Sequence, residues 1–314
     1  VWNGGTGSWF NPDKWDQRRV PTVRDDVYVK TGTVVITGAG IAQAATVLIG
    51  EATLFIGSNG ILHLEDGNGK PALENHGIVR AFGEISISEH DGIGIQNLGT
   101  IHFEPGSESQ YYNLSNTAIE NKPGAVLVHE GSLSIFSVDG HGIYNNGHLL
   151  NSGTMELEVS TTAWNAALKN IGEFHNQAQG YILITSAYYG LDHSSIADIF
   201  ENDGKIRIEG TEAAGLYSGD HFINGLTGSI VLDDCSMNLN GSFQNFGGIT
   251  INKGSDNTYG GLGMWCNCEL ENNGFIYLNQ TRETGLILNG YSASIDNHGT
   301  LNISDNTENS VEIL

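Results

Sequence analysis

The stretch Phe243-Gln-Asn245-Phe-Gly247-Gly-Ile249-Thr-Ile251 carries the pattern that decides the fold of this chain. An apolar residue is followed by Asn, then by Gly, and then by alternating apolar residues. The phrase apolar-x-Asn-x-Gly returns about once every 21 to 27 residues, and its clearest copies start at Leu73, Ile95, Ile143, Leu168, Phe200, Phe243, Leu270 and Ile295. A fixed period of this length is the signature of a solenoid, in which each repeat forms one coil.

The phrase has a physical explanation in which its Asn points into the coil. Residues two apart in a strand share a face, so Asn245 faces the same way as Phe243 and Ile249. An inward Asn at a corner can hydrogen-bond backbone groups that the bend leaves unpaired, and stacked coils align such amides in a ladder. Gly247 is expected to supply a positive φ at the turn. The predicted ladder consists of Asn75, Asn97, Asn121, Asn145, Asn151, Asn170, Asn176, Asn202, Asn224, Asn245, Asn272 and Asn297.

Short alternating strands, ended by Gly, Asn or Asp, fill the rest of the chain. Residues 46–49, 53–56 and 61–64 are examples, and no stretch keeps a helical period over 12 residues. We therefore predict an all-β fold, a single-stranded parallel β-helix of about 11 coils over residues 30–314.

Residues 1–29 differ from the repeats and hold three of the five Trp residues, namely Trp2, Trp9 and Trp15. A solenoid needs an atypical terminal unit to cover its open end, so we predict an N-terminal cap here. Contact of these Trp side chains with a ligand or partner is the alternative. The residues after Ile303 carry no evident cap, which predicts either a longer natural chain or contact with another chain. The start at Val1, without Met, fits a processed or trimmed protein.

The charge balance limits the partners that the chain can have. Lys and Arg together number 13 against 36 Asp and Glu, which gives a formal charge of −23. Such a surface repels nucleic acid and anionic membranes, and no run of 18 apolar residues could span a membrane. We expect no nucleic-acid partner, no membrane insertion and no cofactor, with Ca²⁺ bound at most adventitiously by the many carboxylates.

The three cysteines, Cys235, Cys266 and Cys268, form no even framework. Cys266 and Cys268 alternate with Met264 and Leu270, which predicts core thiols on one face of a strand. A disulfide from Cys235 to either of the other two is the alternative. No matching Cys or His pair accompanies them, so no metal site is expected.

Aromatic side chains on a polar surface suit contact with sugars or proteins. Two Tyr pairs fall at expected corners of the coil, and Trp164 and Trp265 lie elsewhere. The candidate contact residues in these pairs are Tyr111, Tyr112, Tyr188 and Tyr189. Packing over irregular loops is their alternative role.

The phrase Asn-x-Gly-x-Ile-x-Ile, together with the opening Trp-x-Gly-Gly of residues 2–5, resembles secreted bacterial right-handed β-helix proteins of the adhesin and autotransporter-passenger type. The resemblance covers nearly the whole chain and concerns architecture. It implies a right-handed coil, an extracellular or cell-surface location, and an adhesive or structural role. The implied partners are further copies of the chain, in a filament or sheath, or a cell-surface glycan or protein.

Pectin-degrading enzymes share this architecture, so a polysaccharide lyase or hydrolase is the alternative function. Gly140-His141-Gly142 looks like a polygalacturonase motif. The Asn-Thr-Asp that should accompany it is missing, Asp233-Asp234 follows His141 instead of preceding it, and 205–207 reads Lys-Ile-Arg, the reverse of the expected order. We therefore expect a non-catalytic protein.

Overall fold

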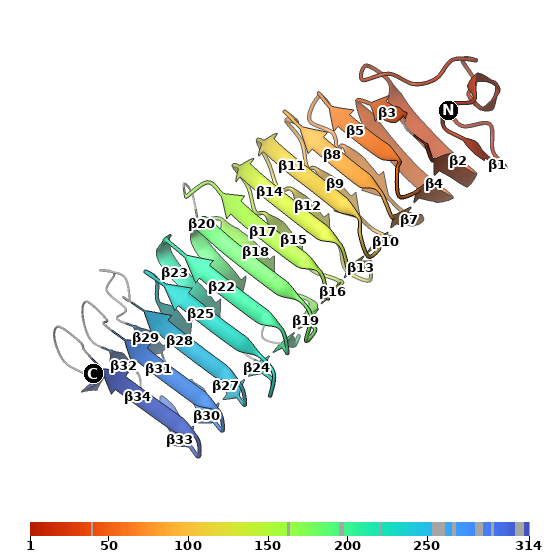
Figure 1. Ribbon diagram of the computed structural model, residues 1–314. Coiled ribbons are helices and arrows are strands. Elements are labelled where there is room, and N and C mark those ends of the chain that lie inside the picture. Colours follow the sequence, from red (N-terminus) through yellow and green to blue (C-terminus); the bar gives the residue numbers. More distant parts are fainter. Residues whose placement is uncertain are drawn as a thin grey trace. The chain divides into compact units, whose positions relative to one another are not determined.

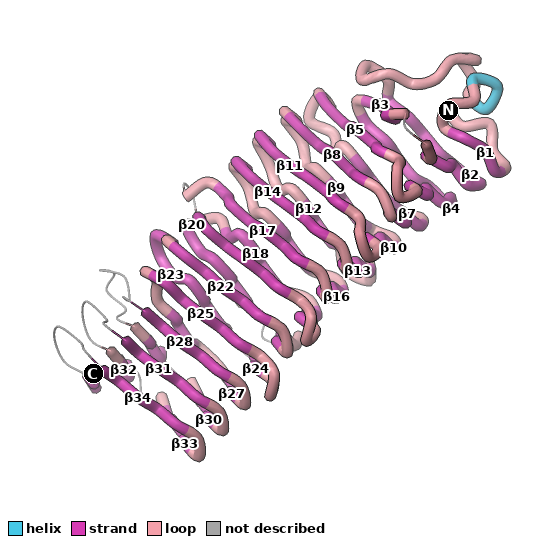
Figure 2. Tube along the Cα trace, in the orientation of Figure 1, coloured by secondary structure: helices cyan, strands magenta, loops and turns pink. Residues whose placement is uncertain are grey.

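A computed structural model describes residues 1–38, 40–161, 164–194, 198–219, 221–252, 261–265, 268–279, 285–289, 292–304 and 311–313. The chain divides into two compact units, Val1–Met155 and Glu156–Leu314. About 62% of the residues lie in strands and 1% in helix. The short 3₁₀ helix η1 (Pro12–Lys14) is the cyan segment in Figure 2, where strands occupy most of each coil and loops form the corners. Among the described residues, no helix has the length and apolar character needed to cross a membrane.

The first unit contains β1 (Thr6–Ser8), β2 (Asp26–Ile36), β3 (Ile41–Ala44), β4 (Thr46–Ile56), β5 (Ile61–Glu65), β6 (Leu73–Asn75), β7 (Ile78–Ala81), β8 (Glu84–Ser88), β9 (Ile95–Asn97), β10 (Thr100–Phe103), β11 (Glu108–Leu114), β12 (Ile119–Asn121), β13 (Val126–His129), β14 (Ser132–Val138), β15 (Ile143–Asn145) and β16 (His148–Asn151). Strand β17 (Thr154–Val159) spans the boundary between the units.

The second unit contains β18 (Ala166–Asn170), β19 (Glu173–Asn176), β20 (Tyr181–His193), β21 (Phe200–Asn202), β22 (Lys205–Glu209), β23 (Thr211–Ser218), β24 (Phe222–Asn224), β25 (Ser229–Asp233), β26 (Met237–Leu239), β27 (Ser242–Asn245), β28 (Gly248–Asn252), β29 (Leu262–Trp265), β30 (Glu269–Asn272), β31 (Phe275–Asn279), β32 (Leu286–Asn289), β33 (Ser294–Asn297), β34 (Thr300–Ser304) and β35 (Val311–Ile313).

Coils of three strands stack in parallel in the first unit. Strands β6, β7 and β8 of one coil pair with β9, β10 and β11 of the next, and Figure 1 shows β5, β8, β11 and β14 side by side. The register places Leu73 against Ile95 and Asn75 against Asn97, so copies of the phrase lie directly over one another. The predicted parallel β-solenoid is confirmed, with about 11 turns counted over both units.

The second unit repeats this arrangement around an aromatic core. Strands β21, β22 and β23 pair with β24, β25 and β26, and β22, β25, β28, β31 and β34 lie side by side in Figure 1. The apolar residue that opens the phrase stacks on its equivalent in the next coil, with ring centroids 4.5 to 4.7 Å apart along Phe174, Phe200, Phe222 and Phe243. Burial of these rings holds successive coils in register.

The Asn side chains of the phrase form hydrogen-bonded ladders within each unit. Each amide Nδ2 donates to Oδ1 of the Asn one coil later, over 2.6 to 2.8 Å, along Asn75–Asn97–Asn121–Asn145 and along Asn176–Asn202–Asn224–Asn245–Asn272–Asn297. Asn97 also bonds to the backbone at its corner, because its side chain donates to Val126 O and accepts from Gly99 N. The ladder thus satisfies backbone groups at each corner as well as linking the coils.

Histidines border the two remaining members of the ladder set. Asn151 is buried, and its Oδ1 lies 2.8 Å from His129 Nδ1, one coil earlier in the first unit. Asn170 is also buried, donates to Gly172 O and lies 3.1 Å from His193 Nδ1 in the second unit. An imidazole nitrogen offers the Asn amide a partner where the neighbouring coil has no Asn.

The corner glycines are required for a reason other than the expected positive φ. Gly247, Gly274 and Gly299 do not have positive φ, so the expectation about Gly247 is wrong. Instead, a Cβ on Gly274 would overlap the carbonyl oxygen of Gly247, and one on Gly299 would overlap that of Gly274. Glycine is needed here because the backbones of successive coils touch at this corner.

The three N-terminal Trp residues pack against one another. Trp15 contacts both Trp2 and Trp9 edge to face at 5.0 Å, and its indole Nε1 donates to Trp9 O over 2.7 Å. All three are buried, with exposures of 3% for Trp2, 0% for Trp9 and 2% for Trp15. Their assignment as ligand contacts is therefore corrected, because no ring face is open to a ligand. The three Trp side chains instead form a small core of their own, and strand β2 begins after this segment, at Asp26.

Cys235 and Cys268 are free, buried thiols, so they form no disulfide with each other; Cys266 lies outside the described residues. Burial raises the pKa of Cys235 to about 12 and that of Cys268 to about 11. Both thiols are therefore neutral core groups.

Candidate functional site

An exposed aromatic cluster lies in the second unit and consists of Trp164, Tyr188, Tyr189 and Tyr217. The Trp164 ring centroid is 5.3 Å from that of Tyr188 and 6.5 Å from that of Tyr189, and Tyr189 lies 6.4 Å from Tyr217. Trp164 is 71% exposed and each Tyr is half-buried. The predicted contact residues Tyr188 and Tyr189 are thus joined by an exposed Trp and by Tyr217, which the sequence did not single out.

The regular coil repeat has an irregularity beside this cluster. Strand β20 pairs with β23, and the register shifts between Ala187 and Tyr189. The extra residue of this shift lies in β23, since Ala187 pairs with Thr211 and Tyr189 with Ala214. On β20, Tyr188 and Tyr189 are both partly exposed, where an ordinary strand would send one of them inward. Trp164 has φ of +60°, which is uncommon for a bulky residue and presents its ring to solvent.

Polar groups border the aromatic cluster. Lys169, Asp192 and Tyr217 occupy equivalent positions on β18, β20 and β23. Lys169 Nζ lies 3.0 Å from Asp192 Oδ2, and Asn240 Nδ2 donates to the Tyr217 hydroxyl over 3.3 Å. An exposed ring surface bordered by hydrogen-bonding groups is the combination that binds the apolar face and the hydroxyls of a sugar.

The first Tyr pair behaves differently from the second. Tyr111 is 0% exposed, whereas Tyr112 is 38% exposed, because the alternation of β11 sends them to opposite faces. Tyr111 pairs in register with Ile87 and Ile135 of the core, and burial raises the pKa of its hydroxyl well above the usual range. The assignment of Tyr111 as a contact residue is corrected, and Tyr112 remains exposed.

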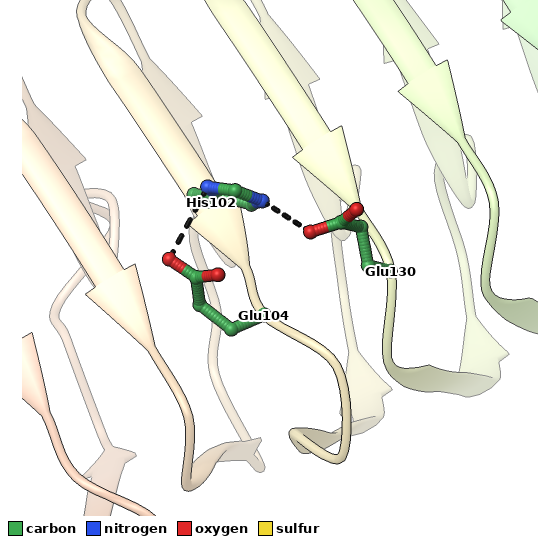
Figure 3. Close-up of side chains that lie close together, drawn as sticks. All are labelled: His102, Glu104 and Glu130. Carbon is green, nitrogen blue, oxygen red and sulfur yellow. Dashed lines mark hydrogen bonds and ion pairs between the residues drawn. The ribbon is translucent and has the colours of Figure 1, made fainter.

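A second site, absent from the sequence-based predictions, lies in the first unit and comprises His102, Glu104 and Glu130. Figure 3 shows the imidazole between the two carboxylates, with Nδ1 3.3 Å from Glu104 Oε1 and Nε2 2.7 Å from Glu130 Oε2. One ligand atom from each residue lies within 4.8 Å of the others. The sequence signal is His-x-Glu followed by a Glu one coil later, and it is readable only once the stacking of coils is known.

Arg80 holds one carboxylate of this site in place. Its Nε donates to Glu104 Oε1 over 2.7 Å, and Nη2 contacts the same oxygen. The guanidinium carbon lies 5.5 Å from the ring centroid of Phe82. The side chain of Glu104 is only 8% exposed, so Arg80 neutralises a carboxylate that would be costly to bury alone.

An open groove of about 600 Å³ lies at the same series of corners in the first unit, lined by residues that include Asn59, Glu84 and Glu108. Glu84 and Glu108 each lie one position before a registered pair of β8 and β11, so they are on adjacent coils. Burial, followed by the negative charge of Glu108, raises the pKa of Glu84. Two carboxylates in a groove are the minimum that a glycosidase needs.

The residues of the polygalacturonase-like motif have structural contacts. His141 lies 5.7 Å from the ring of Tyr144 in the first unit. In the second unit, Asp233 accepts from Asn252 Nδ2 over 2.8 Å and pairs with Arg207 Nη2 at 2.9 Å. The carboxylate of Asp233 thus links three successive coils through outward side chains.

No protein-family model, no curated protein and no solved structure matches this chain significantly. The likeness to secreted β-helix adhesins stays a prediction from the sequence.

Proposed function

We propose that this chain is a non-catalytic, extracellular binding protein that attaches to a neutral glycan through the aromatic cluster. The observation that carries the proposal is the exposure of Trp164, 71%, beside Tyr188. Burying the exposed ring of a Trp against the apolar face of a sugar contributes a favourable free energy of binding. Aromatic rings are also rigid and lose little conformational entropy on binding.

The charge of the chain supports a neutral ligand over an acidic one. The formal charge is −23, and a polyuronate carrying one negative charge per sugar would be repelled at low ionic strength. Lys169, which lies in register with Asp192 beside the aromatic cluster, is already paired with that carboxylate. Attachment through stacking and hydroxyl hydrogen bonds fits a neutral pyranose polymer.

The proposal is tested with defined polysaccharides. The purified chain is assayed by affinity electrophoresis against mannan, xyloglucan and a mixed-linkage β-glucan, with polygalacturonate as the acidic comparison. We expect retardation by at least one neutral polymer, none by polygalacturonate at low salt, and no release of reducing ends. Failure to bind any neutral polymer contradicts the proposal.

The groove with Glu84 and Glu108 favours a second candidate function, a glycoside hydrolase. Glu84, with its raised pKa, would be the general acid, and Glu108 the second carboxylate. If the wild type releases reducing ends from a polymer and Glu84→Gln abolishes this release, the hydrolase proposal replaces the first one. Self-assembly into a filament or sheath stays a prediction from the sequence, which electron microscopy of the purified chain would test.

A further inference from the structure

We propose that His102, Glu104 and Glu130 form a binding site for a divalent transition metal ion, with Zn²⁺ as the preferred occupant. The site is separate from the aromatic cluster and from the proposed glycan binding. Its donor set of one imidazole and two carboxylates is complete in a patch of three residues. Imidazole and carboxylate are ordinary ligands of Zn²⁺, with bonds of about 2.0 to 2.2 Å.

The backbone holds the three residues in fixed places. His102 lies in β10, in register with Arg80 of β7 and Val128 of β13. The two Glu residues follow their strands at successive corners, where Glu104 N donates to Ala81 O and Glu130 N to Phe103 O, each over 2.8 Å. Only side-chain rotation is therefore needed to close the site, and preorganised ligands bind a metal more tightly.

Arg80 gives this site a feature that an ordinary surface ion pair lacks. It binds Glu104 through Oε1 alone, which leaves Oε2 of this nearly buried carboxylate for a metal ion. Carboxylates that ligate metals are commonly oriented by such a hydrogen-bonding partner. The stacking of Arg80 on Phe82 in turn restrains the guanidinium.

The geometry favours Zn²⁺ over Ca²⁺ or Mg²⁺. Two carboxylates and a nitrogen are too few for Ca²⁺, which takes about six to eight oxygens, and Mg²⁺ prefers oxygen ligands. On binding, ligand atoms spread over up to 4.8 Å draw together to roughly 3.4 Å, the separation across a tetrahedral ion. Glu130, whose side chain is 34% exposed, has room for this movement, and water completes the coordination.

The second unit provides a matched control. His175 also contacts two carboxylates, with Nε2 2.8 Å from Glu173 Oε1 and Nδ1 2.8 Å from Glu201 Oε2. Yet in the described part of the chain only the His102 group brings three such ligand atoms within 4.8 Å of one another. A general affinity of surface His–Glu pairs for Zn²⁺ would thus appear equally at His175.

The experiment is a calorimetric titration of the full 314-residue chain with ZnCl₂, and with CaCl₂ in parallel. We compare the wild type with His102→Gln, Glu130→Gln and the control His175→Gln. The expected result is one saturable Zn²⁺ site that His102→Gln and Glu130→Gln each weaken at least tenfold, with His175→Gln unchanged and no saturable Ca²⁺ binding. Circular dichroism of the metal-free variants confirms that each one is folded.

A second readout reports coordination directly. Co²⁺ replaces Zn²⁺ in such sites, and its visible absorption intensifies when nitrogen and carboxylate ligands hold it in a tetrahedral geometry. The intense band is expected in the wild type and in His175→Gln, and is lost in His102→Gln. Equal Zn²⁺ binding by the wild type and His102→Gln, or no saturable site in the wild type, overturns the proposal.

Discussion

The buried imidazole of His129 lies next to the Asn ladder and makes the stability of the folded chain depend on pH. Its Nδ1 is hydrogen-bonded to Asn151, while Nε2 has no hydrogen-bond partner among the described residues. Burial lowers its pKa to about 4, so the folded chain keeps this ring neutral. The register places His129 against Asn151, and an Asn at position 129 would therefore extend the ladder by one coil.

This environment predicts a loss of stability in mild acid. In the unfolded chain the His129 ring takes up a proton near pH 6.5, whereas in the folded chain it does so only near pH 4. The contribution of the neutral ring to the stability of the folded state is therefore complete above about pH 6.5, and it declines as the pH falls toward 4. The decline amounts to roughly 3 kcal/mol. Urea titrations between pH 7 and 4 should show a smaller decline for His129→Asn than for the wild type. Identical pH profiles for the two proteins would refute this role of His129.

At the scale of the structural element, the sequence phrase predicts the strand pattern because its Asn and Gly each have a local structural role at the corner of the coil. The inward Asn was predictable from parity with its apolar neighbours, as Asn97 demonstrates. The reason for the Gly was not, because it depends on how closely the preceding coil approaches Gly247. Residues that meet across coils, such as Trp164 with Tyr188, could be paired only after the register was known.

Two adjacent glycines test the close contact between coils. A Cβ on Gly247 would overlap the backbone of the preceding coil, whereas one on Gly248 meets nothing within 4 Å and needs no unusual φ. We predict that Gly247→Ala destabilises the solenoid by roughly 1 to 3 kcal/mol through this overpacking. Gly248→Ala should be neutral or slightly stabilising, since Gly weakens a strand. Thermal and urea midpoints of both variants measure the difference, and equal midpoints would contradict the explanation.

At the scale of the whole molecule, repetition accounts for the fold, and departures from repetition accompany the aromatic cluster. The ladder Asn side chains of the phrase are mostly buried and hydrogen-bonded, which makes them scaffold. Trp164 and the shifted register beside Tyr189 lie where the repeat is broken. Charge acts over the whole chain as well, since its excess of 23 negative charges disfavours anionic ligands.

We propose that the aromatic cluster holds a neutral glycan, and a comparison of two variants tests this proposal. Binding to the neutral polymer retained most strongly by the wild type is measured for Trp164→Ala and for Tyr112→Ala, an exposed aromatic residue outside the cluster. We predict at least a tenfold loss of affinity for Trp164→Ala and no change for Tyr112→Ala. Full binding by a folded Trp164→Ala protein would contradict it.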